Sequence, residues 1–250
     1  YNNLGKWQTA IDNFKLSLEL KAGDANLYYN LGLSYYKNNQ APDAIAAFKR
    51  SLKRKPNNVA QLYYHLGLAY TKNNQILKAR RVHKKASEID RSFVDNYYEL
   101  ANTYLLKDKY VMAIEQFQQA IALNSRYTKA YLGMGLTYYY LKKYSKALAM
   151  YKQALQLDES FIPAHTATGM TYMKIKQYDK ATQAYRKALK QDPRDIHALI
   201  GLAMSYQTRR YWKKALEVYA KVLKIDAENA IVYTSIGNIY FNSNNYIAAI

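Results

Sequence analysis

Apolar residues recur every three or four positions along most of the chain, in stretches of about a dozen residues. Short polar segments, such as Lys37–Gln40 and Lys72–Gln75, separate these stretches. A period of three to four places the apolar side chains on one face of an α-helix, and polar runs of this length are typical of tight turns. Pro42 stands in the first turn of an expected helix, where its missing N–H costs nothing. The pattern predicts an all-α protein of short amphipathic helices.

A second, longer period overlies the helical one. A small residue recurs with spacings of 35, 34, 34, 34, 34 and 34 residues, at Gly32, Gly67, Ala101, Gly135, Gly169, Ala203 and Gly237. Twelve residues after each stands an alanine, and sixteen residues after the first six stands a large ring: Phe48, His83, Phe117, Tyr151, Tyr185 and Tyr219. A fixed period of this length indicates stacked repeats, in which each repeat buries its apolar face only against its neighbours.

These columns resemble the tetratricopeptide repeat, whose 34-residue pattern carries an aromatic residue, Leu-Gly, Tyr, Ala, an aromatic residue, Ala and a closing Pro. The opening aromatic is Tyr28, Tyr63, Tyr97, Tyr131 and Tyr233, and two repeats carry His165 and Leu199 instead. The closing proline is present as Pro56 and Pro193. The resemblance implies an α-α superhelix, a right-handed solenoid of antiparallel helix pairs.

The same alignment gives the expected domain organisation. It places six full repeats at 25–58, 60–93, 94–127, 128–161, 162–195 and 196–229, with partial repeats at 1–24 and 230–250. We therefore expect one continuous array over residues 1–250. Because both ends fall inside a repeat, we also expect the chain to be a piece of a longer protein.

Tyrosine is the unusual feature of the composition, with 28 residues in a chain of 250. Twenty of them fall in four columns that helix packing explains: the opening aromatic, the position three after the small residue, the turn aromatic and the ring column. Six others lie three before or four to five after the small residue. Those offsets describe one stripe along the first helix of each repeat.

In the tetratricopeptide family that stripe lines the concave groove in which peptide partners bind. The resemblance therefore implies a Tyr-, Leu- and Met-lined groove for an extended or helical segment of a partner protein. Lysines near the groove suit acidic or amphipathic segments. The expected groove residues are Tyr29, Leu33, Tyr36, Lys37, Tyr64, Leu68, Lys72, Tyr98, Asn102, Leu105, Lys129, Leu132, Leu136, Tyr139, Tyr140, Met170, Met173, Lys174 and Met204.

Two binding modes known in the family are disfavoured by the residues at the equivalent positions of this sequence. The clamp for C-terminal carboxylates needs lysine at the positions that here hold Tyr29, Tyr64 and Tyr98. The asparagine ladder of arrays attached to protein glycosyltransferases needs Asn two before each small residue, and only Asn30 meets this requirement.

The formal net charge of +19 indicates acidic or polyanionic partners. Lysines and arginines recur on the second helices, seventeen or eighteen residues after the small residue, as a stripe on the outer side of the array. One interpretation is a solvated face that keeps the protein soluble. The alternative is a surface that binds nucleic acid, a sulfated glycan or an acidic protein.

Nothing in the sequence argues for catalysis, a metal or a cofactor. The chain has no cysteine, and its four histidines have no ligand-like partners at three or four residues. We expect a non-catalytic interaction scaffold; the alternative is the substrate-recruiting part of a larger enzyme such as a glycosyltransferase. No membrane span is expected, and the absence of a targeting signal leaves cytoplasm and periplasm both open.

Overall fold

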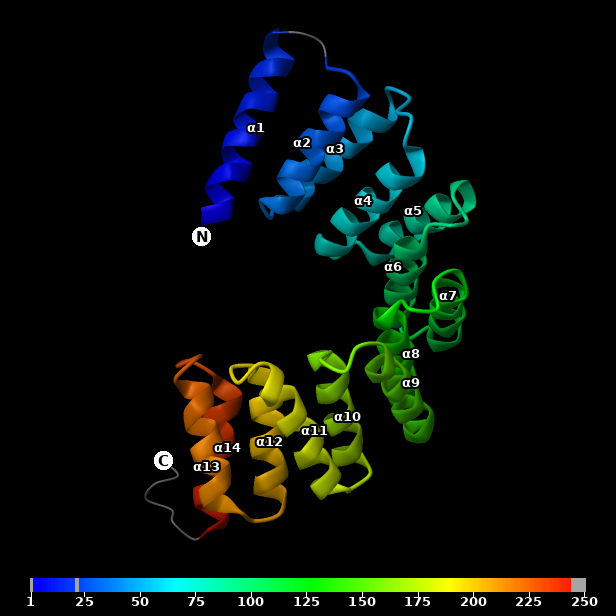
Figure 1. Ribbon diagram of the computed structural model, residues 1–250. Helices are drawn as coiled ribbons and strands as arrows, with labels where there is room; N and C mark the ends of the chain where they lie inside the picture. Colours follow the sequence, from blue (N-terminus) through cyan, green and yellow to red (C-terminus); the bar gives the residue numbers. More distant parts are fainter. Residues whose placement is uncertain (1, 21–22, 244–250) are drawn as a thin grey trace. The chain divides into compact units, whose positions relative to one another are not determined.

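The structure, a computed structural model, describes residues 2–20 and 23–243, and over these residues it is helical without strands, which confirms the predicted all-α class. The ends of the two expected partial repeats, residue 1 and residues 244–250, lie outside this range. The helices are α1 (Asn2–Leu20), α2 (Ala25–Lys37), α3 (Ala41–Leu52), α4 (Val59–Lys72), α5 (Ile76–Ile89), α6 (Val94–Leu105), α7 (Tyr110–Leu123), α8 (Thr128–Tyr140), α9 (Tyr144–Leu157), α10 (Ile162–Lys174), α11 (Tyr178–Gln191), α12 (Ile196–Thr208), α13 (Trp212–Leu223) and α14 (Ala230–Asn242) (Figure 1).

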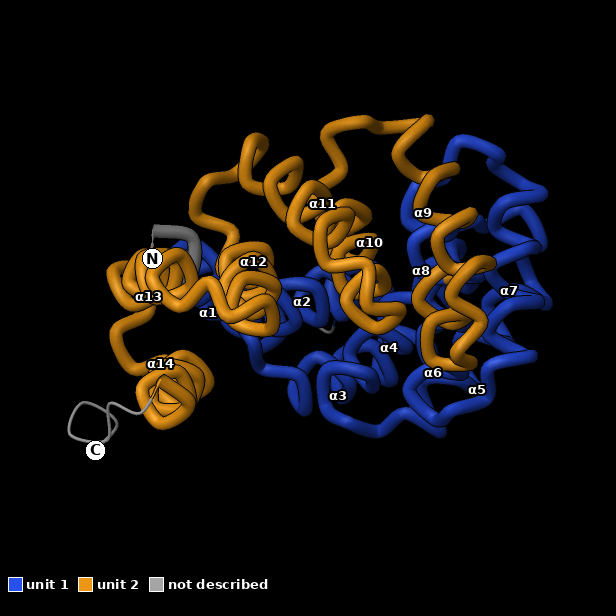
Figure 2. Tube along the Cα trace, turned by 90° about the horizontal axis from the view of Figure 1, so that it is seen from below, with its two compact units in different colours: residues 1–133 blue, residues 134–250 orange. Residues whose placement is uncertain are grey.

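The chain divides into two compact units, residues 1–133 and 134–250, and the boundary falls within α8 (Figure 2). Within unit 1, α2 packs on α3, α4 on α5 and α6 on α7, while α3 also packs on α4 and α5 on α6. Unit 2 repeats this arrangement, with α10 on α11, α12 on α13, and α11 on α12. Each unit is thus a stack of helical hairpins in chain order.

The turn inside each hairpin has one residue in the left-handed region, always at the same place in the repeat. These residues are Asn39, Asn74, Asp108, Lys142, Lys176 and Arg210, with φ between 54° and 62°. Asn and Asp reach this region at low cost, whereas lysine and arginine are less suited to it. The turn geometry is therefore fixed by the packing of the two helices even where the residue is unfavourable.

The ring column packs directly against the small-residue column. A Cβ added at Gly32 would lie 2.6 Å from the ring of Phe48, and one at Gly135 would lie 2.4 Å from the ring of Tyr151. The ring of Tyr185 has glycines on two sides, since a Cβ at Gly169 would come within 2.7 Å and a Cβ at Gly201 within 2.4 Å of it. One buried ring therefore fills the space that a missing side chain leaves on its own first helix and on that of the next repeat.

His83 occupies the ring column of the repeat 60–93 and is fully buried. Its Nδ1–H donates to Oδ1 of Asn96 at 2.8 Å, and the Asn96 amide donates to the backbone oxygen of His83 and to Ser87. Burial lowers the pKa of His83 to about 4, although the hydrogen bond that His83 donates to Asn96 acts in the opposite direction. His83 is a neutral core residue at physiological pH.

The predicted packing role is visible for the tyrosines of the ring column. Tyr151, Tyr185 and Tyr219 are at most 2% exposed. Tyr233 of the opening column differs, with 55% of its surface exposed on α14, whose main packing partner among the described helices is α13.

Replacing Phe117 with alanine should lower the free energy of unfolding by about 3–5 kcal/mol, because its fully buried ring leaves a cavity between helices. Val111→Ala on the same helix is the matched control; Val111 is 69% exposed, and its loss should cost less than about 0.5 kcal/mol. Urea denaturation of the three proteins tests this, and equal losses would contradict the packing described.

His83→Phe should cost about 1–3 kcal/mol, since it leaves the Asn96 side-chain oxygen without its donor in the core. Adding Asn96→Leu should recover most of the lost stability, because Leu62 fills the same position one repeat earlier. A base whose folded pKa is lowered stabilises the fold above its unfolded pKa and loses that stability as pH falls. The decrease in stability that the wild type shows as pH falls from 6.5 to about 4 should therefore be smaller in the double variant, which lacks His83. An unchanged pH profile of the melting temperature in the double variant would contradict the description of His83 as a neutral core residue.

Candidate functional site

Four of the predicted tyrosines share one face of unit 1, which we call the tyrosine face: Tyr29 and Tyr36 on α2, Tyr64 on α4 and Tyr98 on α6. All four are half-buried. Leu33, Leu68, Leu105 and Asn102 on the same helices are half-buried as well. The stripe read from the sequence thus consists of side chains that rest on the helices and still present surface to a ligand.

Contacts within a repeat and between neighbouring repeats hold the rings of the tyrosine face in place. The Tyr29 hydroxyl shares a hydrogen bond with Nδ1 of His65 at 3.0 Å, and the two rings meet edge to face at 5.6 Å between centroids. The Tyr64 ring lies 4.8 Å from Phe93, and the Tyr98 ring lies 5.7 Å from Tyr127. Rings held in place before binding lose little rotational freedom when a ligand arrives.

A carboxylate, Glu99 of α6, belongs to this face. Glu99 is half-buried, and burial raises its pKa above the ordinary value, with a further contribution from Asp95. The Asn102 amide and Lys129 act in the opposite direction. The charge of Glu99 also raises the pKa of Tyr36 and of Tyr64, in both cases after burial, which locates the carboxylate among these rings.

A second carboxylate stands one helical turn before Glu99. Asp95 Oδ1 accepts a hydrogen bond from the Tyr127 hydroxyl at 2.5 Å. Burial and this hydrogen bond both raise the pKa of Tyr127, so it remains a donor at physiological pH. The face therefore combines aromatic rings with two carboxylates on α6.

The predicted lysines of unit 1 lie around the tyrosine face. Lys72 Nζ lies 4.6 Å from the centroid of the Tyr36 ring and donates to the Tyr36 backbone oxygen at 3.1 Å. Lys37 and Lys129 are exposed, and Leu132 beside Lys129 on α8 is half-buried. Of these three cations, Lys72 is thus already partly engaged by the protein itself.

The predicted residues of unit 2 form a different surface. Tyr139 is half-buried and meets the exposed Tyr140 edge to face at 5.7 Å between centroids. Met170 on α10 and Met204 on α12 are 41% and 45% exposed. Met173 packs against the core of unit 2, while Leu136 is half-buried and Lys174 is exposed. This surface is largely apolar and carries methionines, whereas that of unit 1 carries tyrosines and carboxylates.

Sequence reasoning did not find Glu99, Asp95, His65 or Tyr127 as members of the site. One signal was available for Glu99, which is the only acid in the column two before the small residue. Tyr127 stands in a turn outside every packing column. Glu99 owes its importance to side chains of other repeats, and Tyr127 to side chains at the opposite end of its own repeat. A column-by-column comparison does not bring such residues together.

Over residues 2–20 and 23–243 the structure contains no group of three or more His, Cys, Asp or Glu side chains that could hold a metal ion. None of its helices is both long enough and apolar enough to cross a membrane.

Glu99→Gln should raise the melting temperature at pH 7. A carboxyl group whose folded pKa is raised stabilises the fold below its unfolded pKa and loses that contribution as pH rises through the folded pKa. At neutral pH the wild type is thus destabilised by the buried charge of Glu99. The higher melting temperature of Glu99→Gln should vanish below about pH 4.5, the ordinary pKa of a glutamate side chain. Glu115→Gln, at an exposed position on α7, is the control and should change little. A lower melting temperature for Glu99→Gln at pH 7 would refute the assignment.

Family models described as "Tetratricopeptide repeat" match residues 25–58, 60–93, 94–127, 128–161, 162–195 and 198–231, and one described as "TPR repeat" matches residues 1–39. No curated protein sequence matches the chain.

Solved structures with the same fold include MamA, at 29% identity and a TM-score of 0.58 over 65% of this chain and 95% of that one. A tetratricopeptide repeat protein from Parabacteroides merdae gives 17% identity and a TM-score of 0.74 over 90% and 89% of the two chains. A chain of the APC/C hetero-tetramer Cut9–Hcn1 gives 18% identity and 0.73 over 98% of this chain and 48% of that one.

Proteins built from these repeats generally bind partner proteins, and the fold is typically that of a non-catalytic scaffold. The matches from residue 1 to residue 231 and the stacked hairpins lead to one conclusion. The chain belongs to the tetratricopeptide repeat family.

Proposed function

We propose that this protein is a non-catalytic scaffold and that the tyrosine face of unit 1 binds an extended or helical segment of a partner protein. The observation that carries the proposal is the combination of preset, partly exposed rings with a carboxylate whose charged form the fold disfavours. Titratable groups that are kept at a cost to stability concentrate at functional sites.

The chemistry of the tyrosine face favours a partner segment with a lysine or arginine side chain. Aromatic rings attract cations through their faces, and the attraction grows when water is excluded. Glu99 and Asp95 would add charge-assisted hydrogen bonds to the same cation. A cation arriving here would also relieve the desolvated charge of Glu99, so that binding would recover what the free protein loses in stability.

The residues that flank the basic side chain in the partner segment would contact the rest of the tyrosine face. Leu33, Leu68 and Leu105 offer apolar contacts to neighbouring side chains of the segment. The lysines Lys37 and Lys129 lie exposed beside the face, where they suit acidic residues of the segment, as the sequence suggested. The segment we propose is thus amphipathic, with a basic residue at its centre and acidic residues at its ends.

We propose that the exposed surface of unit 2 binds apolar side chains independently of the tyrosine face. Tyr140, Met170 and Met204 are each exposed by more than two-fifths of their surface. Methionine adapts its shape to different apolar partners at little cost. We propose this surface as a less selective contact than the tyrosine face.

Peptides selected from a random display library against the full chain should be enriched in a lysine or arginine flanked by apolar residues. Tyr64→Ala and Tyr98→Ala together should weaken the binding of such a peptide by at least about 30-fold, the effect of one aromatic hot spot. Tyr233→Ala is the matched control, because Tyr233 is 55% exposed on α14 and outside the face. Isothermal titration calorimetry gives the affinities, and circular dichroism verifies the helical content.

A double-mutant cycle separates the carboxylate from the rings. Glu99→Gln should weaken a lysine-containing peptide about tenfold and leave the peptide with norleucine at that position almost unchanged. Equal affinity of the wild type and the Tyr64, Tyr98 double variant would reject the tyrosine face as the binding site.

A further inference from the structure

Helix α5 differs from the second helices of the other repeats in its charge. It carries Lys78, Arg80, Arg81, Lys84 and Lys85, with Glu88 as its single acid. Thirteen residues after the small residue it has Arg80, where other repeats have Ile45, Ile114, Leu148, Thr182 and Leu216. One residue later it has Arg81, where Ala46, Glu115, Ala149, Gln183 and Glu217 stand elsewhere. The two arginines depart from a pattern that helix packing alone sets.

These arginines line a groove of about 460 Å³ between α5 and the start of α7, over Tyr104 of α6. The lining contains four cations, Arg80, Arg81, Lys84 and Lys109, and no carboxylate. Within the described residues, the one ion pair closer than 4.0 Å joins Arg209 to Asp179, so none of the four has a carboxylate partner at that distance. The groove gathers positive charge without internal compensation.

Arg80 is held in place by an aromatic ring. Its guanidinium carbon lies 5.3 Å from the centroid of Tyr104, and the side chain is half-buried. A stacked guanidinium loses less freedom when it binds an oxyanion, and its planar fork donates two parallel hydrogen bonds. Leu77 and Met112, which also line the groove, are 63% and 48% exposed. An apolar group could rest on these two side chains.

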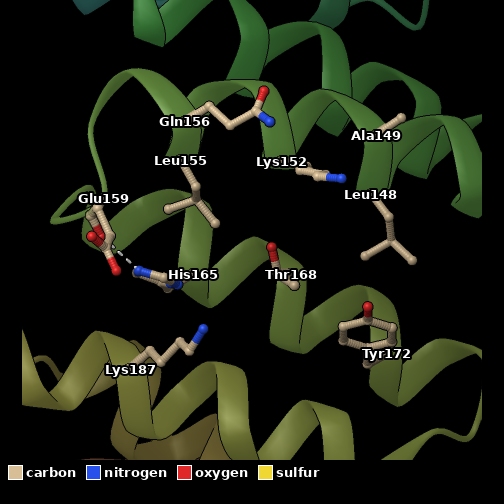
Figure 3. Close-up of a pocket in the computed structure, with 10 residues that line it drawn as sticks. All are labelled: Leu148, Ala149, Lys152, Leu155, Gln156, Glu159, His165, Thr168, Tyr172 and Lys187. Carbon is tan, nitrogen blue, oxygen red and sulfur yellow. Dashed lines mark hydrogen bonds between the residues drawn. The ribbon is translucent and has the colours of Figure 1, made fainter.

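The equivalent groove of unit 2 provides a natural comparison (Figure 3). It has about 510 Å³ and lies over Tyr172, the counterpart of Tyr104. Leu148 and Ala149 replace Arg80 and Arg81, and Lys152 corresponds to Lys84. Its lining has two lysines and one acid, Glu159, whose backbone oxygen accepts a hydrogen bond from His165 Nε2 at 2.8 Å. A groove at this place in the repeat is thus a common feature, while the concentrated positive charge is particular to α5.

Part of the basic outer stripe has a simpler explanation. Lys78, Lys146, Lys180 and Lys214 lie 5.6–6.0 Å from the centroids of Tyr70, Tyr138, Tyr172 and Tyr206, each eight residues earlier in the chain. This regular contact accounts for those lysines as scaffold. It does not account for Arg81, Lys84 or Lys109.

We propose that the groove between α5 and α7 binds a phosphate monoester or a group of equivalent charge, carried by a molecule with an apolar part. The four cations would receive the oxyanion, and Leu77 and Met112 would contact the apolar part. A groove of this size is within the range of small-molecule sites. The site is independent of the tyrosine face, which contains the carboxylates Glu99 and Asp95 where this groove has none.

Phenyl phosphate and inorganic phosphate are the probes, titrated into the full chain and followed by amide resonances in NMR spectra. Phenyl phosphate should shift the resonances of residues 77–84 and 104–112 more than those of the unit 2 groove, and it should bind more tightly than inorganic phosphate. Arg80→Leu with Arg81→Ala, which installs the residues of the unit 2 groove, should weaken binding at least about tenfold. The fold should tolerate both changes, because Leu148 and Ala149 occupy the same positions.

The matched control is Lys152→Gln with Lys187→Gln, which removes two charges from the unit 2 groove. This variant should bind phenyl phosphate as the wild type does. Equal weakening by both double variants would show an effect of net charge alone and would overturn the proposal. Shifts spread evenly over the lysines of both units would overturn it as well.

Vesicles distinguish a lipid headgroup from a soluble phosphate ester as the natural source of the group. The chain is sedimented with phosphatidylcholine vesicles that contain or lack phosphatidic acid. Sedimentation that needs phosphatidic acid and Arg80 and Arg81 would assign the site to a headgroup. Binding of phenyl phosphate without sedimentation would assign it to a soluble ester. Failure of both would overturn the proposal and would leave the peptide-binding proposal untouched.

Discussion

The contact between one buried ring and the small residues around it is the constraint on which this structure depends. Tyr185 illustrates it, because a Cβ on either Gly169 or Gly201 would meet its ring at 2.7 Å or less. The first glycine belongs to the same repeat and the second to the next, so a single ring sets both the distance within a hairpin and the distance between hairpins. Repetition of this contact every 34 residues propagates the hairpin stack within each unit.

That constraint also explains which residues are free to serve function. The ring, glycine and alanine columns are committed to packing, and His83 shows that even a titratable side chain in such a column becomes a neutral core residue. The exposed stripe of the first helices is not committed in this way. In unit 1 it carries tyrosines and the carboxylate of Glu99, whose burial is a cost to the free protein. In the proposed binding site, stability and binding would thus depend on the same residue, as is common where a site holds charge away from water.

Much of the fold could be predicted from the sequence because the same packing contacts recur in every repeat. The all-α class and the packing roles of the ring column follow from spacing alone. The stripe with Tyr29, Tyr64 and Tyr98 could be predicted for the same reason, since offsets along a helix fix its faces. The division of the chain within α8 had no such signal, because the small-residue spacing continues through it without change.

The chemistry of the sites was less accessible to sequence reasoning. Glu99 matters because tyrosines from two other repeats surround it, and Arg80 matters because it stacks on Tyr104 of the following repeat. Such interactions join residues that are 24 to 63 positions apart, and no single column contains them. Departures from a column, such as an acid at Glu99 or an arginine at Arg80, are the signal that sequence retains of them.

A crystal structure of the full chain with a selected lysine-containing peptide tests the central claim most directly. The account predicts that the lysine side chain lies against Tyr64 and Tyr98, with its nitrogen about 3 Å from a carboxylate oxygen of Glu99. A peptide bound on the second helices, with Glu99 left in contact with solvent, would contradict it.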